Sequence, residues 1–164
     1  MPQKGILFSG TIRSNLAYGD RTASGEQIER SARIAQAMEF IESKPDLFDT
    51  MIAQGGGNVS GGQKQRLSIA RALVKDAPIN IFDDSFSALD FKTDAKLRSA
   101  LKEETGDTTQ FLVAQRISTI MNADQIIVLD HGKMVGRGTH RELMAGCKVY
   151  REIALSQLSE EELQ

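Results

Sequence analysis

Cysteine is almost absent from this sequence of 164 residues, in which Cys147 is the single one. One cysteine cannot form an internal disulfide, excludes most metal sites built from cysteine, and fits a protein of the reducing cytosol. No apolar run approaches the roughly 20 residues that a membrane-spanning helix requires. The apolar run at Gly5–Phe8 is too short for the core of a signal peptide. We therefore expect any link to a membrane to come from a partner or from sequence outside these residues.

The sequence also lacks a large excess of positive or negative residues. The formal net charge is −2, so nothing marks the chain as a general nucleic-acid binder. The length is that of one domain, and a hydrophobic content of 40% suits a packed globular core. The sequence has no linker, internal repeat or low-complexity tract.

Apolar residues at helical spacing dominate the first half, and short strands alternate with helices after Pro78. This alternation predicts a parallel α/β sheet. Besides a helix that begins after Ser60, the expected helices cover 11–18, 24–41, 91–104, 139–145 and 149–158, with a helical turn at 117–121. The expected strands cover 79–82, 108–114, 125–129 and 134–135. The acidic tail, 159–164, is expected to be frayed.

The stretch Ser60-Gly61-Gly62-Gln63 opens the most informative helix of the chain. Ser60 is a good N-cap residue. The buried face of the helix is predicted from four apolar residues, Leu67, Ala70, Leu73 and Val74. Two glycines let the backbone approach a phosphate closely, and the free N–H groups and positive dipole end of the helix favour an anion there.

With Val59 in place of the usual leucine, this stretch resembles the signature motif of the ATP-binding cassette (ABC) ATPases. In that family the motif closes over the γ-phosphate of ATP that is bound to a partner subunit. The resemblance implies that Ser60, Gly61, Gly62 and Gln63 contact nucleotide in trans. It also implies an α/β fold, in which part of a P-loop NTPase core with a parallel sheet is joined to the α-helical subdomain of the family.

The run Ile79–Asp84 looks like a Walker B motif, in which a buried strand delivers an acid at its C-terminal end. Asp83 would then hold Mg²⁺, largely through water. The next position is normally the glutamate that polarises the attacking water, and here it is Asp84. Aspartate is one methylene shorter, and a general base needs hydrogen-bond reach to the water, directly or through a second water.

Two further stretches resemble family loops. Ser87-Ala88-Leu89-Asp90 resembles the D-loop, which contacts the partner across the dimer. Residues 113–119 resemble the H-loop, but Gln115 stands where the family has histidine. Glutamine can hydrogen-bond a phosphate oxygen but does not titrate near neutral pH. Two departures at catalytic positions, Asp84 and Gln115, are typical of the non-canonical subunit of heterodimeric ABC exporters.

The first residues resemble the Q-loop of exporters and the segment after it. Gln3 would sense the γ-phosphate or Mg²⁺ and link it to transmembrane domains. No Gly-x-x-x-x-Gly-Lys-Ser/Thr occurs in the 164 residues, although the family carries this phosphate-binding Walker A loop about 40 residues before the Q-loop. The resemblance therefore covers about two-thirds of a nucleotide-binding domain, and Met1 is either a start or an internal methionine.

The resemblance implies one domain part over 1–164: a helical subdomain at about 10–76, a partial nucleotide-binding core at about 77–148, and a C-terminal helix and tail at about 149–164. It implies ATP and Mg²⁺ as cofactors, and no nucleic acid as a partner. The expected partners are a second ABC ATPase subunit in a head-to-tail heterodimer and transmembrane domains upstream in the same polypeptide. The resemblance implies that this arrangement lies at the cytoplasmic face of the cell membrane. We expect the isolated residues to be marginally stable and without ATPase activity.

The sequence leaves two other functions open. The chain could be a truncated, non-enzymatic protein that docks on an ABC partner through Ser60–Gln63 and Asp90. It could also be an SMC-like DNA-repair ATPase, which shares the signature motif. Those proteins insert a long coiled coil between the Q-loop and the signature motif, whereas here Gln3 and Ser60 are only 57 residues apart with no heptad run.

Overall fold

The computed structural model describes residues 1, 3, 5–106 and 108–158, and the chain divides into two compact units, Met1–Val113 and Ala114–Gln164. The expected frayed tail, 159–164, lies outside the described residues. The elements of the first unit are β1 (Gly10–Thr11), α1 (Ile12–Ala17), α2 (Gly25–Ile34), α3 (Met38–Glu42), η1 (Leu47–Asp49), β2 (Met51–Ile52), η2 (Gln54–Gly56), α4 (Gly61–Val74), β3 (Ile79–Asp83), α5 (Phe91–Glu104) and β4 (Thr109–Val113). Those of the second are α6 (Ile117–Ile120), β5 (Ile126–Asp130), β6 (Lys133–Gly138), α7 (His140–Gly146) and α8 (Lys148–Gln157).

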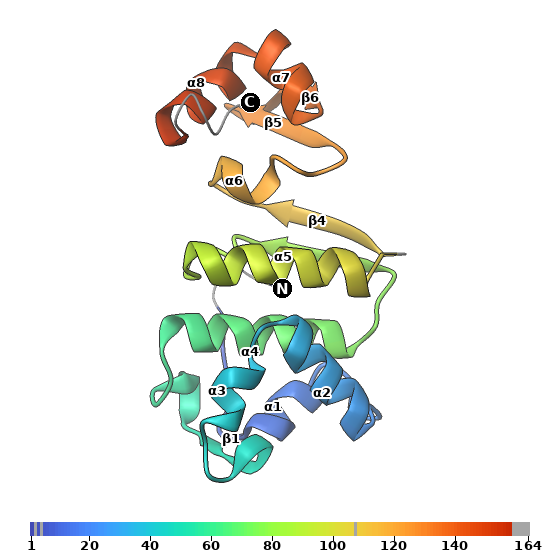
Figure 1. The fold of residues 1–164 in the computed structure, drawn as a ribbon, viewed down its shortest axis with the longest axis vertical. Helices are drawn as coiled ribbons and strands as arrows, with labels where there is room; N and C mark the ends of the chain where they lie inside the picture. The colour runs from blue at the N-terminus through green and yellow to red at the C-terminus, as the bar shows by residue number, and fades with distance from the viewer. Residues whose placement is uncertain (2, 4, 107, 159–164) are drawn as a thin grey trace. The chain divides into compact units, whose positions relative to one another are not determined.

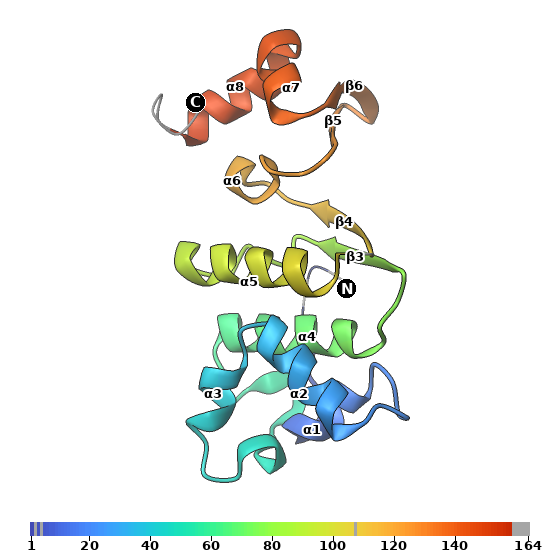
Figure 2. The same ribbon diagram turned by 45° about the vertical axis from the view of Figure 1, so that its right-hand side comes forward.

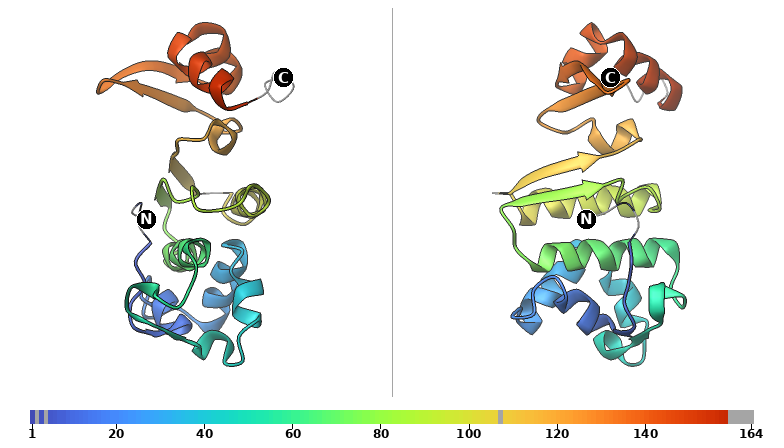
Figure 3. Two further views of the ribbon diagram at one scale, coloured as in Figure 1. Left: turned by 90° about the vertical axis from the view of Figure 1, so that its left-hand side faces the viewer. Right: turned by 180° about the vertical axis from the view of Figure 1, so that it is seen from behind.

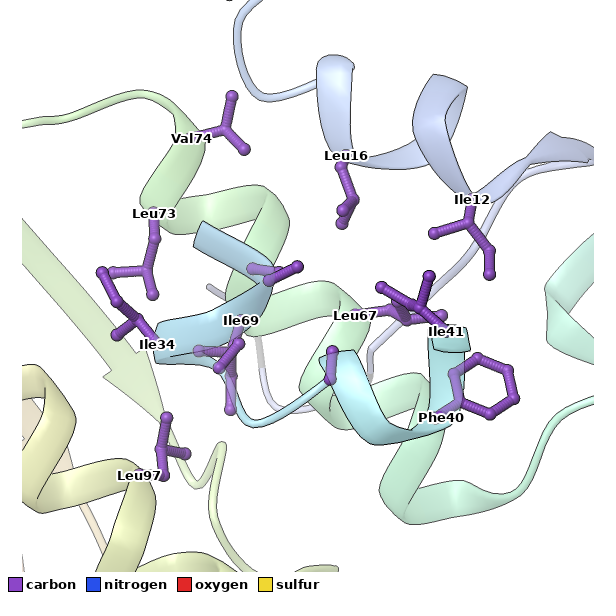
Figure 4. Packing of buried hydrophobic residues seen from close by; sticks show 14 of the residues in the cluster. Ile12, Leu16, Ile34, Phe40, Ile41, Leu67, Ile69, Leu73, Val74 and Leu97 are labelled. Atoms are coloured by element: carbon purple, nitrogen blue, oxygen red, sulfur yellow. The ribbon is translucent and has the colours of Figure 1, made fainter. Parts of the chain in front are cut away.

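Helix α4 is the central element of the first unit. The apolar face predicted for it is confirmed, because Leu67, Ala70, Leu73 and Val74 are all buried. Figure 4 shows residues of α4 packed among side chains of α1, α2 and α3. The labelled members of this core are Ile12, Leu16, Ile34, Phe40, Ile41, Leu67, Ile69, Leu73, Val74 and Leu97. Full burial of each such side chain stabilises the fold by about 1.5–3 kcal/mol.

The single long helix expected over 24–41 is wrong, because α2 ends at Ile34 and α3 begins at Met38. Gln36 has φ +56°, the left-handed conformation that ends a helix. The Gln36 side-chain amide bonds the carbonyls of Arg33 and Ile34 at the end of α2. The change of direction lets α3 turn Phe40 and Ile41 into the core, which one straight helix would not do.

Buried Asn15 fixes the segment that leads from the N-terminus into α1. Its Oδ1 accepts from Phe8 N (2.8 Å), while its Nδ2 donates to the carbonyls of Phe8 (2.9 Å) and Thr11 (3.0 Å). The side chain therefore replaces the ladder partner that an extended backbone would need. The short antiparallel pair β1–β2, which the sequence did not predict, joins Gly10 to Ile52 and Thr11 to Met51.

Strands β3 and β4 form a parallel pair in which Ile81 lies opposite Phe111 and Asp83 opposite Val113. Helix α5 covers one face of the pair (Figure 3), and Phe82 is buried on that side in the same core as Leu97 of α5. The other face is apolar and open among the described residues. It carries Ile79, Ile81, Phe111 and Val113, each more than half exposed.

The second unit is built on an antiparallel hairpin, β5–β6, that turns at His131-Gly132 and contains a bulge between Val128 and Leu129. Helices α7 and α8, coloured orange to red in Figures 1 and 2, complete this unit. Its core contains Val128, Leu143, Cys147 and Tyr150. The strands expected at 125–129 and 134–135 are thus confirmed, the second as part of β6. The alternation after Pro78 gives one parallel pair and this hairpin.

Candidate nucleotide site

The carboxylates of the proposed Walker B motif lie where β3 ends. Asp83 is the last residue of the strand and is exposed. Asp84 follows with φ +45°, a conformation that aspartate adopts more readily than most residues. The Asp84 N–H donates to Val113 O across 2.8 Å, so the turn is tied to the end of the neighbouring parallel strand. This is the edge of an α/β sheet at which ligands bind.

Gln3 lies at the same edge. Met1 is held beside β3 by two hydrogen bonds, because its amino group donates to Ile81 O and its carbonyl accepts from Asp83 N. Two residues on, Gln3 Nε2 lies 3.4 Å from Asp84 Oδ2. The structure therefore brings together two residues 81 positions apart that the sequence predicts for one site.

A capping box builds the N-terminus of α4. Ser60 Oγ accepts from Gln63 N (3.3 Å), and Gln63 Oε1 accepts from Ser60 N (2.9 Å). Helix geometry leaves the N–H groups of Gly61 and Gly62 without a partner inside the helix. The first turn has no acidic residue, and a Cβ added to Gly61 would meet no atom within 4 Å outside its own helix backbone and chain neighbours. These donors and the positive dipole end form a surface that can bind an anion.

The loop before α4 is held in shape by Asn58. Its Oδ1 accepts from Ala53 N (3.0 Å) and its Nδ2 donates to Met51 O (2.9 Å). Gly55 and Gly56 have φ +68° and +69°, which favours glycine at both positions. The approach to the signature helix is therefore a defined turn.

The D-loop candidate, Ser87-Ala88-Leu89-Asp90, joins the Asp84 turn to α5. Ser87 Oγ donates to Asp84 O (2.9 Å), and Leu89 is buried. Asp90 caps α5, and hydrogen bonds from the backbone N–H and then the hydroxyl of Thr93 hold the pKa of its carboxyl below the ordinary value of 3.8.

Gln65 contacts this loop and was not predicted as a site residue. It is 6% exposed, with Oε1 2.9 Å from Ala88 N and Nε2 3.3 Å from Asp84 O. One signal was present in the sequence. Gln65 is four residues before Ile69 and eight before Leu73, and so it is a polar residue on the apolar face of a helix.

Gln115, the residue at the H-loop position, belongs to the second unit and is exposed. The side chain of Gln157 on α8 holds its backbone. Gln157 Nε2 donates to Gln115 O (2.9 Å), and Gln157 Oε1 accepts from Ile117 N (2.9 Å). The turn that carries Gln115 is therefore defined within its own unit.

An Mg²⁺ ion fits the donors at the end of β3. Mg²⁺ is usually bound by one or two carboxylates together with waters and phosphate oxygens. The exposed carboxylate of Asp83 and the amide oxygen of Gln3 are donors of this kind. No cluster of three or more histidine, cysteine or acidic residues occurs in the described part of the chain. The residues thus fit a metal that nucleotide helps to bind, and not a closed all-protein site.

Comparison with known proteins decides the family, since residues 1–87 match the sequence profile of the ABC transporter family. This chain belongs to the ABC transporter family. An uncharacterized ABC transporter ATP-binding protein of Mycobacterium tuberculosis is 48% identical over 160 residues, which are 96% of this chain and 27% of the relative. The ATP-dependent lipid A-core flippase of Desulfotalea psychrophila is 48% identical over 142 residues, covering 87% of this chain and 25% of the flippase.

Among solved structures, a bacterial Atm1-family ABC exporter with ATP bound matches this chain with a TM-score of 0.93 and 38% identity. The match covers 97% of this chain and 28% of the exporter chain. This chain thus spans about a quarter of the length of these relatives. Its α/β fold is that of an ABC exporter's ATP-binding domain. No helix in the described ranges is long and apolar enough to cross a bilayer.

Proposed function

We propose that this chain is the ATP-binding part of an ABC exporter, in which ATP binding and hydrolysis between two ATPase subunits drive transport across a membrane. The observation that carries the proposal is the N-terminus of α4. Ser60 and Gln63 form a capping box there, Gly61 is exposed and Gly62 half-buried, and helix geometry leaves the N–H groups of both glycines without a partner inside the helix. An anion site of this kind suits the phosphates of a nucleotide bound to another subunit.

The second part of the proposal concerns the ATP site to which the chain's own Walker B motif contributes. Asp83 would hold Mg²⁺, Gln3 would contact Mg²⁺ or the γ-phosphate, and Ser87–Asp90 would face the partner. Bound Mg²⁺ neutralises phosphate charge during transfer of the γ-phosphoryl group. Asp84 and Gln115 replace the expected glutamate and histidine, so we propose that this site hydrolyses ATP slowly and that the partner supplies the faster site.

The assembly follows from these roles. We propose a head-to-tail heterodimer with a second ABC ATPase, joined to transmembrane domains and located at the cytoplasmic face of a cell membrane. We also propose the subdomain limits given by the sequence, with a helical subdomain at 10–76 and a partial core at 77–148. Export as the direction of transport is supported by the names of the relatives, an Atm1-family exporter and a lipid A-core flippase.

ATPase activity of the purified, membrane-assembled exporter tests the proposal. Because the 164 residues contain no Walker A sequence, the chain alone is expected to be inactive, and the assembled exporter is expected to hydrolyse ATP in the presence of Mg²⁺. Substitution Asp83→Asn should remove nucleotide turnover at this chain's own site. Turnover by the isolated chain that persists in Asp83→Asn after rigorous purification would show that the proposed function is wrong.

A further inference from the structure

Gln65 uses both ends of its side-chain amide on one loop. It lies one turn after the signature glycines, and its oxygen accepts from Ala88 N while its nitrogen donates to Asp84 O. A buried amide whose donor and acceptor are both satisfied avoids the penalty of an unpaired polar group. Gln65 therefore ties α4 to the segment 84–88, which lies 19 to 23 residues further along the chain.

The packing around the amide brings the loop onto the first turns of α4. A Cβ added to Gly62 would lie 3.4 Å from Ala88 O, so the D-loop backbone is already in van der Waals range of the signature motif. On the other side, Asp84 O accepts from both Gln65 Nε2 and Ser87 Oγ. The left-handed turn at Asp84 is thus fixed by two side chains, of which only Gln65 belongs to α4.

We propose that Gln65 is a positioning residue that couples the two ATP sites to which this chain contributes. This inference rests on the proposed function, because it requires that Asp83 and Asp84 serve one nucleotide and that Ser60–Gln63 serve another. Gln65 joins those two groups within one subunit. A shift of the Asp84 turn when ATP binds therefore moves the start of α4. This movement in turn changes the position of the surface that contacts the partner's nucleotide.

The chemistry of the residue matters as well as its size. Glutamine supplies one acceptor and one donor at the end of a two-carbon stem, and the loop needs both. Leucine at this position keeps most of the volume but removes the hydrogen bonds that Gln65 makes with Ala88 N–H and Asp84 O. An ionised glutamate keeps the acceptor but places a negative charge against the carbonyl of Asp84, whereas a neutral glutamic acid can again donate.

The first test measures the link itself by hydrogen–deuterium exchange in the full-length exporter. The expected result for Gln65→Leu is at least about tenfold faster exchange in the peptide that covers residues 84–90. The matched control is Gln110→Leu, because Gln110 is a half-buried glutamine of the same unit whose side chain donates to Thr105 Oγ1, outside residues 84–90. Unchanged exchange in Gln65→Leu overturns the inference.

The second test asks whether the link serves the reaction. Gln65→Leu is expected to lower the kcat of the assembled exporter about tenfold and to change the KM for ATP less than about threefold, because the loss concerns alignment after ATP is bound. Gln65→Glu should be slow at pH 8 and should recover toward the wild-type rate near pH 6. Position 65 is buried, and burial raises the pKa of an introduced glutamic acid and favours its protonated form.

The charged residues next to position 65 on α4 and on the loop that it bonds are the same in all variants. On the loop they are Asp83 and Asp84, the latter bonded by Gln3. On α4, the Lys64 stem lies over Gly56, and Arg66 donates to Gln36 O across 2.8 Å. Rates are therefore compared with wild type and with Gln110→Glu at each pH, and only Gln65→Glu is expected to show recovery.

The outcomes separate this inference from the proposed function. If the wild-type exporter has no ATPase activity, the proposed function is wrong. If it is active and Gln65→Leu is active at the wild-type rate, the coupling role is wrong. If Gln65→Leu does not fold, Gln65→Glu decides, with circular dichroism recorded at both pH values. A kcat that recovers at pH 6 while the fold is unchanged between pH 8 and pH 6 supports the inference, and a wild-type kcat at pH 8 overturns it.

Discussion

Gln3 Nε2 lies 3.4 Å from Asp84 Oδ2 at the end of β3, and this contact joins the proposed Q-loop to the residue that we propose for the position of the catalytic base. The carboxylate of Asp84 is therefore reached by an amide that is expected to contact Mg²⁺ or the γ-phosphate. Hydrogen bonds with Val113, Gln65 and Ser87 fix the backbone at Asp84. The distance from this backbone to which the carboxylate extends is therefore set by the number of methylene groups in the side chain.

The first prediction concerns Asp84 and Gln115. The double substitution Asp84→Glu and Gln115→His in the full-length exporter should raise turnover at this chain's own site at least about tenfold, since a positioned general base contributes about 10²–10⁴-fold. Single-site turnover is measured with the partner's site inactivated. Asp83→Asn added to the double variant should remove the gain. A flat rate in the double variant would show that these two residues do not slow the site.

The second prediction concerns Ser60. Arginine at this position fills the space in front of the α4 N-terminus, and Ser60→Arg should remove most of the exporter's ATPase activity. The matched control is Ser24→Arg, because Ser24 and Gln27 form the same capping box on α2. Both changes lose an N-cap worth about 1 kcal/mol, so equal losses of activity would indicate a stability effect and contradict a role of Ser60 in a nucleotide site.

The open face of the β3–β4 pair leads to the third prediction. Ile81 and Phe111 face each other across the pair and are 55% and 54% exposed. A contiguous exposed apolar face of this kind promotes association. The isolated chain should bind a dye specific for apolar surface and should aggregate at micromolar concentration. The double variant Ile81→Thr and Phe111→Thr should reduce both effects.

The matched control for this face is Met51→Thr, since Met51 is 60% exposed and belongs to β2, outside the β3–β4 pair. Dye fluorescence and light scattering are measured at equal concentration, with circular dichroism to monitor folding. A cooperative thermal transition of the unchanged chain without dye binding would contradict the prediction.

The fourth prediction concerns the pH dependence of the α5 N-cap. The pKa of Asp90 is below 3.8 because the backbone N–H of Thr93, and then its hydroxyl, bond the carboxylate. The folded pKa is thus depressed, so the stabilisation is present above pH 3.8 and is lost as the pH falls through the lower folded value. NMR titration should give an Asp90 pKa below 3.8. Thr93→Val should raise it, although not fully, because the backbone bond is retained. An Asp90 pKa at or above 3.8 would contradict the cap.

Local signals predicted some elements closely. The helix expected at 91–104 is α5 with the same limits, since Asp90 caps it and its apolar residues recur at helical spacing. The helix after Ser60 was predicted for the same reasons. One helix over 24–41 was expected because residues 35–37, where the helix breaks, are Ala-Gln-Ala and contain no glycine or proline. The end of α2 at Ile34 depends on the packing of Phe40 and Ile41 into a core formed by distant residues.

The candidate site shows the same division. A motif identifies Gln3, Asp83 and Ser60 because the residue types stand in a recognisable order. Gln65 carries no such signal beyond a polar residue on an apolar face, and its role depends on a loop about 20 residues away. Its partners are backbone atoms of Asp84 and Ala88, and almost any residue could supply those atoms.

By itself, the sequence determined the helix cap at Ser60, the α/β character, and the resemblance that led to the ABC family. These depend on interactions within a few residues, or on residue types in a fixed order. Only the tertiary structure decided the break at Gln36, the contact between Gln3 and Asp84, and the hold of Gln65 on the D-loop. Those contacts join residues far apart in the chain, and their geometry is set by the packing of the whole unit.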